Sequence, residues 1–169
     1  MSDTKDLASR SSGDGAEQYL TFLLAGQEYG IDILRVQEIK GWDKPTRIPH
    51  SPDHVLGVIN LRGAVVPIID LRMRFGVETA PFGPTTVVIV VRVNGQRGEL
   101  TVGVVVDAVC EVCNVSESEL RPPPDVGGSI DSDFVKGLAM TDKRMLILLS
   151  VDRLINASLL EQISEQKVA

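Results

Sequence analysis

The sequence predicts a mostly β protein built from small barrels, and three observations support this fold class. Aromatic residues make up only 4% of the chain and hydrophobic residues 43%, so the core must be built from Val, Ile and Leu, which favour strands. Short apolar runs are separated by turns rich in Gly, Pro and Asp, as in small barrels. The pattern also recurs along the chain, which indicates two related β halves.

The first elements follow a polar N-terminus. Residues 1–16 are small, polar and mixed in charge, which predicts a disordered tail. The apolar run at 19–24 predicts a strand, and residues 26–28 predict a turn. Residues 29–33 alternate between apolar and polar, which is typical of a half-buried strand.

The internal repeat is visible when GIDILRVQEIK (30–40) is aligned with GVVVDAVCEVC (103–113). Glycines align at the start of the two segments, and Glu38 aligns with Glu111. Each copy follows an apolar strand and a turn that contains glycine. We interpret the two segments as equivalent strands of two related units.

A second pair of segments follows the first in the same order. After a loop rich in proline, each copy continues with a hairpin and a helical pattern, GVINLRGAVVPIIDLRMRF (57–75) and GLAMTDKRMLILLSVDRLI (137–155). This order predicts one domain over residues 17–160, with halves at about 17–83 and 84–155 that can exchange edge strands. Short strands of this kind close into small barrels.

Pro67 and Asp70 mark the first hairpin. Because proline cannot donate to a strand ladder, Pro67 predicts an edge strand or a bulge. Edge strands are places where partners dock. Asp70 precedes the helical run 71–75 and is expected to cap it.

The last segment, 151–165, changes to a helical period. Ser150 precedes this segment and is the expected N-cap. We expect an amphipathic helix that covers the open side of a barrel.

Charge and segment composition exclude several classes of function. The net charge is −6 and no dense Lys/Arg block occurs, so non-specific binding to nucleic acid is not expected. The N-terminus lacks the apolar stretch of a secretory signal, and no run approaches the roughly 18 apolar residues of a membrane span. We therefore expect a cytoplasmic protein that meets a membrane only through a partner.

The two cysteines, Cys110 and Cys113, form a Cys-x-x-Cys pair. With His50 and His54 they have the composition of a zinc site, and alone that of a redox pair. However, the pair lies in an expected strand rather than at a helix N-terminus, where the dipole lowers a thiol pKa. We interpret both as buried or half-buried thiols of a β core, with a metal or redox protein as the alternative.

No catalytic motif stands out, so the remaining candidates are surface charges. Glu38 interrupts an apolar strand and Arg62 lies at the tip of a hairpin. An exposed pair of opposite charges contributes at most about 1 kcal/mol to stability. If such a pair matters, it matters in recognition, where charges set specificity and register.

Three stretches carry a resemblance to a known family: EYGIDILRVQEIKGW (28–42), TRIPHSPDHVLGVINLRGAVVPIIDLRMRFG (46–76) and RMLILLSVDRLIN (144–156). They resemble the CheW family of bacterial chemotaxis coupling proteins, from about Gln18 to the terminal helix. The resemblance implies two SH3-like five-stranded β-barrels with a shared core, short helices and a C-terminal helix. It implies neither catalysis nor a cofactor.

The resemblance also implies partners. Proteins of this family couple the cytoplasmic tips of methyl-accepting chemoreceptors to the regulatory domain of the histidine kinase CheA, in arrays at the inner membrane. The family's receptor and signalling determinants, carried over position by position, fall on Val36, Glu38, Gly57 and Arg62, with neighbours Ile39, Asn60, Leu61 and Gly63.

Our hypothesis is that a receptor binds the exposed Arg62 while Glu38 holds it in place. A coupler for a different sensory array and a detached regulatory domain of a kinase remain alternatives.

Overall fold

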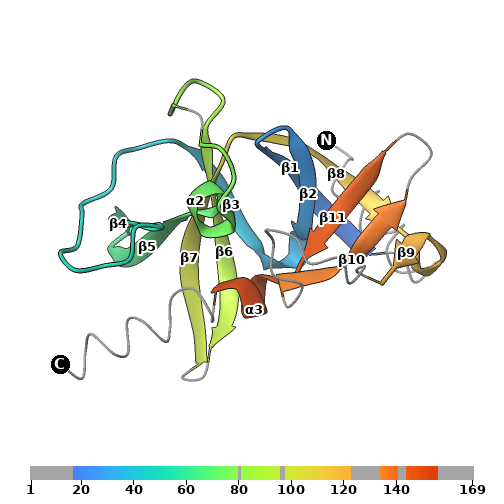
Figure 1. The fold of residues 1–169 in the computed structure, drawn as a ribbon. Coiled ribbons are helices and arrows are strands. Elements are labelled where there is room, and N and C mark those ends of the chain that lie inside the picture. Colours follow the sequence, from blue (N-terminus) through green and yellow to red (C-terminus); the bar gives the residue numbers. More distant parts are fainter. Residues whose placement is uncertain (1–16, 80, 96–97, 123–133, 141–143, 156–169) are drawn as a thin grey trace, which may run out of the picture.

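The computed structural model describes residues 17–79, 81–95, 98–122, 134–140 and 144–155. The tail predicted at 1–16 and residues 156–165 of the predicted terminal helix lie outside these residues. Within them the chain forms two curved sheets side by side (Figure 1). The prediction of a mostly β fold is confirmed.

The two sheets have unequal numbers of strands. The six-stranded sheet has the order β8 (Ala108–Val115), β1 (Glu17–Leu24), β2 (Gln27–Asp32), β11 (Met145–Leu149), β10 (Val135–Met140) and β9 (Leu120–Arg121). The five-stranded sheet has the order β3 (Val36–Gly41), β6 (Val87–Gly95), β7 (Gly98–Val106), β5 (Ala64–Asp70) and β4 (Val55–Leu61). The extra strand is β9, which pairs with β10 through only two residues.

Short helices lie between these strands or follow the last of them. They are η1 (Ile33–Arg35), α2 (Leu71–Phe75), η2 (Glu117–Glu119) and α3 (Val151–Ile155). Asp70 Oδ1 accepts a 3.0 Å hydrogen bond from the backbone N–H of Arg72, so Asp70 caps α2 as predicted. Ser150 Oγ accepts a long bond of 3.5 Å from the N–H of Arg153 in the first turn of α3.

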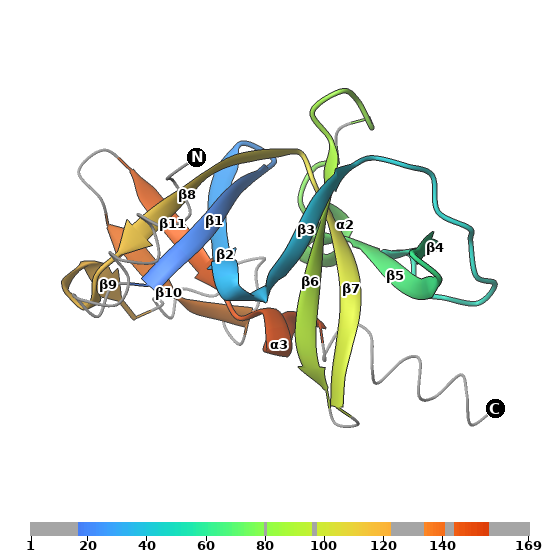
Figure 2. The ribbon, with the colours of Figure 1, turned by 180° about the vertical axis from the view of Figure 1, so that it is seen from behind.

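Each sheet exchanges one strand with the other. After η1 the chain leaves β2 in the six-stranded sheet, and β3 pairs with β6 in the five-stranded sheet. At Asp107 the chain passes from β7 of the five-stranded sheet to β8, which pairs with β1 of the six-stranded sheet (Figure 2). Each sheet therefore contains strands from both sides of residue 83. We call η1 and Asp107 the two crossovers.

Among the described residues, three apolar clusters hold this arrangement together. Tyr19, Leu146 and Leu148 belong to a cluster inside the six-stranded sheet. Val66 and Ile68 belong to one inside the five-stranded sheet. The largest cluster draws on both sheets and both helices α2 and α3, and its members are mostly Val, Ile and Leu. This is the shared core expected between two small barrels.

Two glycines lie at similar places in the two sheets, as the predicted repeat would require. The β4–β5 register shifts between Val55 and Gly57, and the β10–β11 register shifts between Val135 and Gly137. A Cβ at Gly57 would lie 2.1 Å from the Thr46 carbonyl oxygen, and one at Gly137 would lie 2.9 Å from the Arg121 carbonyl oxygen. Only glycine leaves room for the backbone that packs there.

The prediction that Pro67 marks an edge strand is wrong. Its strand, β5, lies between β7 and β4, and the register shift of the β4–β5 pair falls at Val55 and Gly57, not at the proline. The parallel pairing of β5 with β7 begins at Ile68, directly after Pro67. An interior strand can therefore contain a proline just before the place where its second ladder starts.

Candidate partner-binding site

The tip of the β4–β5 hairpin is a two-residue turn. Leu61 pairs with Ala64, so Arg62 and Gly63 form the turn, with φ angles of 53° and 86°. Two positive φ angles are those of a type I′ turn. Asn60 Oδ1 accepts a 2.8 Å hydrogen bond from the backbone N–H of Gly63 and fixes the turn. Arginine is unusual at a left-handed position, and such strain is a reason to suspect function.

Arg62 forms the predicted contact with Glu38. Arg62 Nη1 lies 2.5 Å from Glu38 Oε2, with the Arg62 side chain 70% exposed and that of Glu38 24% exposed. Among the described residues this oxygen accepts no hydrogen bond of standard geometry, so the contact is a charge pair. It joins β3, one edge of the five-stranded sheet, to the turn beside β4, the other edge.

The eight predicted site residues differ in accessibility. Exposed residues are Ile39, Asn60, Arg62 and Gly63, half-buried ones are Val36, Glu38 and Leu61, and Gly57 is buried. Val36 packs against the shared core and Leu61 against the core of the five-stranded sheet. The structure thus brings Glu38 and the hairpin tip together, while Val36, Leu61 and Gly57 support them from within.

Gly57 acts on the loop before β4. Its φ of 144° and the close approach of Thr46 leave no space for a side chain. Thr46 and Val58 exchange two backbone hydrogen bonds of 2.8 Å each. Gly57 therefore fixes this loop against the hairpin and offers no side chain to a partner.

Val65 is a surface residue that the sequence interpretation missed. It follows the turn and is 73% exposed, and Ile39 on β3 is 43% exposed. In β5 the residues after Val65 are buried or half-buried, and in β3 exposed residues alternate with half-buried ones. Strand alternation after the turn is the signal that could have identified Val65.

The six-stranded sheet also carries a charge pair on an edge strand, β8. Glu111 on β8 aligns with Glu38, and it pairs with Arg144, the residue directly before β11. Arg144 also lies 3.4 Å from Glu28. Hydrogen bonding to Glu111 raises the pKa of Arg144, so this cation stays charged. The neighbouring Met140 and Met145 are 47% and 43% exposed.

The cysteines do not both lie in a core. Cys113 is half-buried against the cluster of the six-stranded sheet, but Cys110 is exposed, so that part of the prediction is wrong. The register of β8 with β1 shifts at this place, between Val109 and Val112, which turns Cys110 outward. Partial desolvation of the sulfur atom is the largest cause that raises the pKa of each thiol, which disfavours the reactive thiolate.

The histidines do not assemble with these thiols into a metal site in the described part of the chain. No group of three His, Cys, Asp or Glu side chains there could hold a metal ion. The backbone carbonyl oxygen of His54 accepts a hydrogen bond from the backbone N–H of Asp70.

A buried ion cluster was not predicted from the sequence. Arg72 on α2 contacts Asp70 through two side-chain bonds of 2.9 and 3.0 Å, and Asp107 through one of 2.8 Å. Arg72 and Asp70 are 1% and 2% exposed. Hydrogen bonding to Asp70 is the largest cause that raises the pKa of Arg72. The predicted cap Asp70 was the only sign of this cluster in the sequence.

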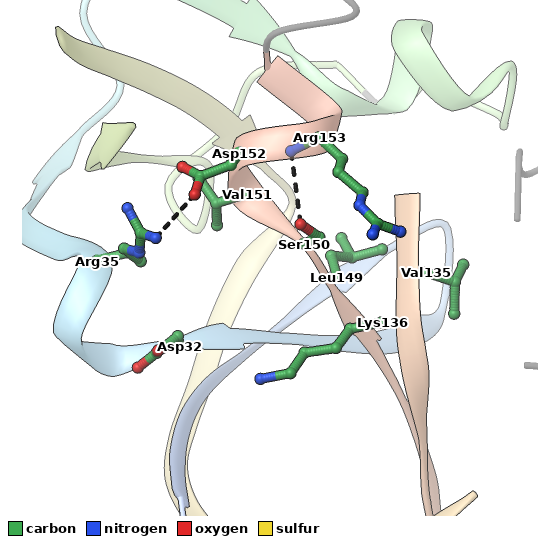
Figure 3. Close-up of a pocket in the computed structure, with 9 residues that line it drawn as sticks. All are labelled: Asp32, Arg35, Val135, Lys136, Leu149, Ser150, Val151, Asp152 and Arg153. Atoms are coloured by element: carbon green, nitrogen blue, oxygen red, sulfur yellow. Dashed lines mark hydrogen bonds and ion pairs between the residues drawn. The ribbon is translucent and has the colours of Figure 1, made fainter. Parts of the chain in front are cut away.

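A cavity of about 330 Å³ lies beside α3, between the end of the six-stranded sheet and η1 (Figure 3). Its charged lining residues are Asp32, Arg35, Lys136, Asp152 and Arg153. Arg35 Nη2 lies 2.8 Å from Asp152 Oδ2. Lys136 is engaged with Glu17 at 3.0 Å and with the Tyr19 hydroxyl at 2.8 Å.

A family model described as the CheW-like domain matches residues 18–159. The chain belongs to the CheW family. The chemotaxis protein CheW of Klebsiella aerogenes is 43% identical over 141 residues, which cover 83% of this chain and 82% of that protein. The probable chemotaxis protein CheW of Rhizobium etli is 38% identical over 147 residues, 87% of this chain and 92% of that protein.

A solved structure agrees with this assignment. The crystal structure of the scaffolding protein TtCheW from Thermoanaerobacter tengcongensis aligns with a TM-score of 0.75 and 38% identity, over 83% of this chain and 92% of that chain. The protein is a chemotaxis adaptor of the CheW type, and members of the CheW family are scaffolds rather than enzymes. None of the described helices is long and apolar enough to span a membrane.

Proposed function

We propose that this protein couples methyl-accepting chemoreceptors to the histidine kinase CheA, on the cytoplasmic side of inner-membrane receptor arrays. Membership of the CheW family supports this role. The observation that carries the proposal at residue level is the exposed Arg62, paired with Glu38 and kept in a strained turn. A non-glycine residue in a left-handed conformation is strained, and such residues cluster at functional sites.

The receptor surface in this proposal centres on the hairpin tip. Arg62 would bind a carboxylate or carbonyl of the receptor, and the exposed Ile39 and Val65 would supply apolar contact. Asn60 and Gly63 shape the turn, Leu61 anchors its hairpin, Val36 anchors β3, and Gly57 holds the neighbouring loop. CheA would bind elsewhere, through its regulatory domain.

Reconstitution tests the coupling role. Receptor fragments, CheA and this protein are mixed, and autophosphorylation of CheA is measured with and without the protein. We expect kinase activation only when all three are present. Equal kinase activity in its absence would reject the proposal, and activation by a receptor and kinase from a different sensory system would assign the protein to that system.

A second experiment tests the receptor surface. Arg62→Asn removes the charge and keeps a residue that is favoured in a type I′ turn. We expect at least a tenfold loss of affinity for the receptor fragment and unchanged affinity for CheA. Glu38→Gln should weaken receptor binding less, because Arg62 remains but is held less firmly. Arg121→Asn removes an exposed arginine of the other sheet and serves as the control, with wild-type receptor affinity expected. If Arg62→Asn also bound the receptor with wild-type affinity, the assignment of this surface would be wrong.

A further inference from the structure

Two ion pairs connect the sheets at the crossovers. The first pair is Arg72 and Asp107, 2.8 Å apart. Arg72 lies on α2, which follows β5 of the five-stranded sheet, and Asp107 is the crossover after β7. Asp107 Oδ2 accepts a 2.8 Å hydrogen bond from the backbone N–H of Ala25, in the β1–β2 turn of the six-stranded sheet. The pair therefore links one sheet to a hairpin of the other.

The second pair is Arg35 and Asp152, also 2.8 Å apart (Figure 3). Asp152 lies on α3, which follows β11 of the six-stranded sheet, and Arg35 lies in the crossover η1. Asp152 Oδ1 accepts a 2.9 Å hydrogen bond from the backbone N–H of Asn94, near the end of β6 in the five-stranded sheet. This pair also links one sheet to a hairpin of the other.

The two pairs are equivalent in position and opposite in charge. In the alignment that matches Gly57 with Gly137, Arg72 matches Asp152. In the first pair the helix α2 supplies the cation and the crossover supplies the anion. In the second pair the helix α3 supplies the anion and the crossover supplies the cation. In both, the carboxylate binds a backbone N–H of a hairpin from the other sheet. The same link is thus built twice, with guanidinium and carboxylate exchanged.

The surroundings of the two pairs differ. Arg72 is 1% exposed and is also bound by Asp70, whereas Arg35 and Asp152 are 29% and 30% exposed. The second pair borders the cavity beside α3. Solvent screens an ion pair of this exposure, so it is the weaker link.

We propose that these four residues are positioning residues that fix the orientation of one sheet relative to the other. Apolar burial in the shared core holds the sheets together but has no direction, whereas charge-assisted hydrogen bonds fix angles. The significance for signalling rests on the proposed function, because an adaptor that bridges two partners must hold its binding surfaces at a defined angle.

Distances between spin labels on the isolated protein test this proposal. Labels are attached at Ala64→Cys in the five-stranded sheet and Asn114→Cys in the six-stranded sheet, both exposed, after Cys110→Ser and Cys113→Ser. We expect one narrow distance distribution for the doubly labelled protein with all four ion-pair residues unchanged, which we call the background. Arg35→Asp and Asp152→Arg, each alone, should broaden or shift it.

The double variant Arg35→Asp/Asp152→Arg is the decisive comparison. It recreates the polarity of the first pair at the second, with a carboxylate on the crossover to accept the N–H of Asn94 as Asp107 accepts that of Ala25, so the narrow distribution should return. Single variants with the background distribution, or a double variant as broad as the singles, would overturn the proposal. Asp152→Asn, which has the same shape, replaces any single variant that fails to fold, and the same broadening is expected of it.

Kinase activation in the reconstituted complex separates this proposal from the proposed function. The single variants should bind receptor and CheA with wild-type affinity but activate the kinase several-fold less, and the double variant should recover. If the wild-type protein fails to activate CheA, the proposed function fails, while the label distances still decide whether these residues position the sheets.

Discussion

Arg72 contacts Asp107 at 2.8 Å although 35 residues separate them, and it does so from a side chain that is 1% exposed. Its guanidinium is bidentate to Asp70 as well. Two carboxylates therefore share one buried cation at the place where α2 meets a crossover. Such clusters depend on every member, because removal of one leaves the others buried without a partner.

The variant Arg72→Met keeps the volume of the side chain and removes its charge. We expect a loss of about 3–5 kcal/mol in the free energy of unfolding, because Asp70 stays buried without its cation. Urea unfolding measures this change. Arg121→Met, at an exposed arginine, is the control and should change stability by less than about 0.5 kcal/mol. A loss below about 1 kcal/mol at Arg72 would contradict the role given to the cluster.

The variant Arg62→Asn should not lower stability. Asparagine tolerates the left-handed conformation that arginine adopts at φ 53°, which relieves about 1 kcal/mol of strain. The lost pair with Glu38 offsets at most about 1 kcal/mol. Thermal and urea unfolding should therefore give wild-type stability or a gain of up to about 1 kcal/mol. Arg62→Val, β-branched at the same φ, should instead be clearly destabilised.

The variant Gly57→Ala should lose at least about 2 kcal/mol of stability, because a side chain meets both a strained φ and the Thr46 carbonyl. Amide exchange at Val58 should become faster, because its hydrogen bond to Thr46 is broken. Gly41→Ala is the matched control, since a Cβ there has no neighbour within 4 Å. Equal stability of the two variants would refute this account of Gly57.

The cluster of Glu17, Tyr19 and Lys136 predicts a pH dependence. Hydrogen bonding to Lys136 is the largest cause that lowers the pKa of Glu17 below its ordinary 4.5. A lowered pKa in the folded state stabilises the protein above pH 4.5, and this contribution disappears as the pH falls through the folded-state value. The unfolding free energies of wild type and Glu17→Gln should thus differ at neutral pH and converge in acid. A constant difference down to pH about 2 would show that the carboxylate charge is not involved.

Local patterns in the sequence identified the hairpin tip and the repeat but not the contacts between distant segments. Arg62 and Glu38 were recognisable because charges interrupt apolar strands. Asp107 has no such signal: it follows a strand and looks like an ordinary turn residue until β8 pairs with β1. Periodicity indicates that a segment is a strand but not which strand becomes its neighbour.

Pro67 and Cys110 illustrate the same limit. Whether a proline lies at an edge depends on where the neighbouring ladder begins, and here it begins one residue later, at Ile68. Whether a thiol in a strand points inward depends on register, and β8 shifts its register next to Cys110. Both outcomes are set by pairing partners far away in the chain.

The exchange of β3 and β8 has a mechanical meaning. Because both crossovers carry the backbone from one sheet into the other, a load applied by a partner at either end passes through covalent bonds as well as through packed side chains. The two sheets are therefore not separate units joined by a single flexible linker. A displacement of one sheet is transmitted to the other through both crossovers.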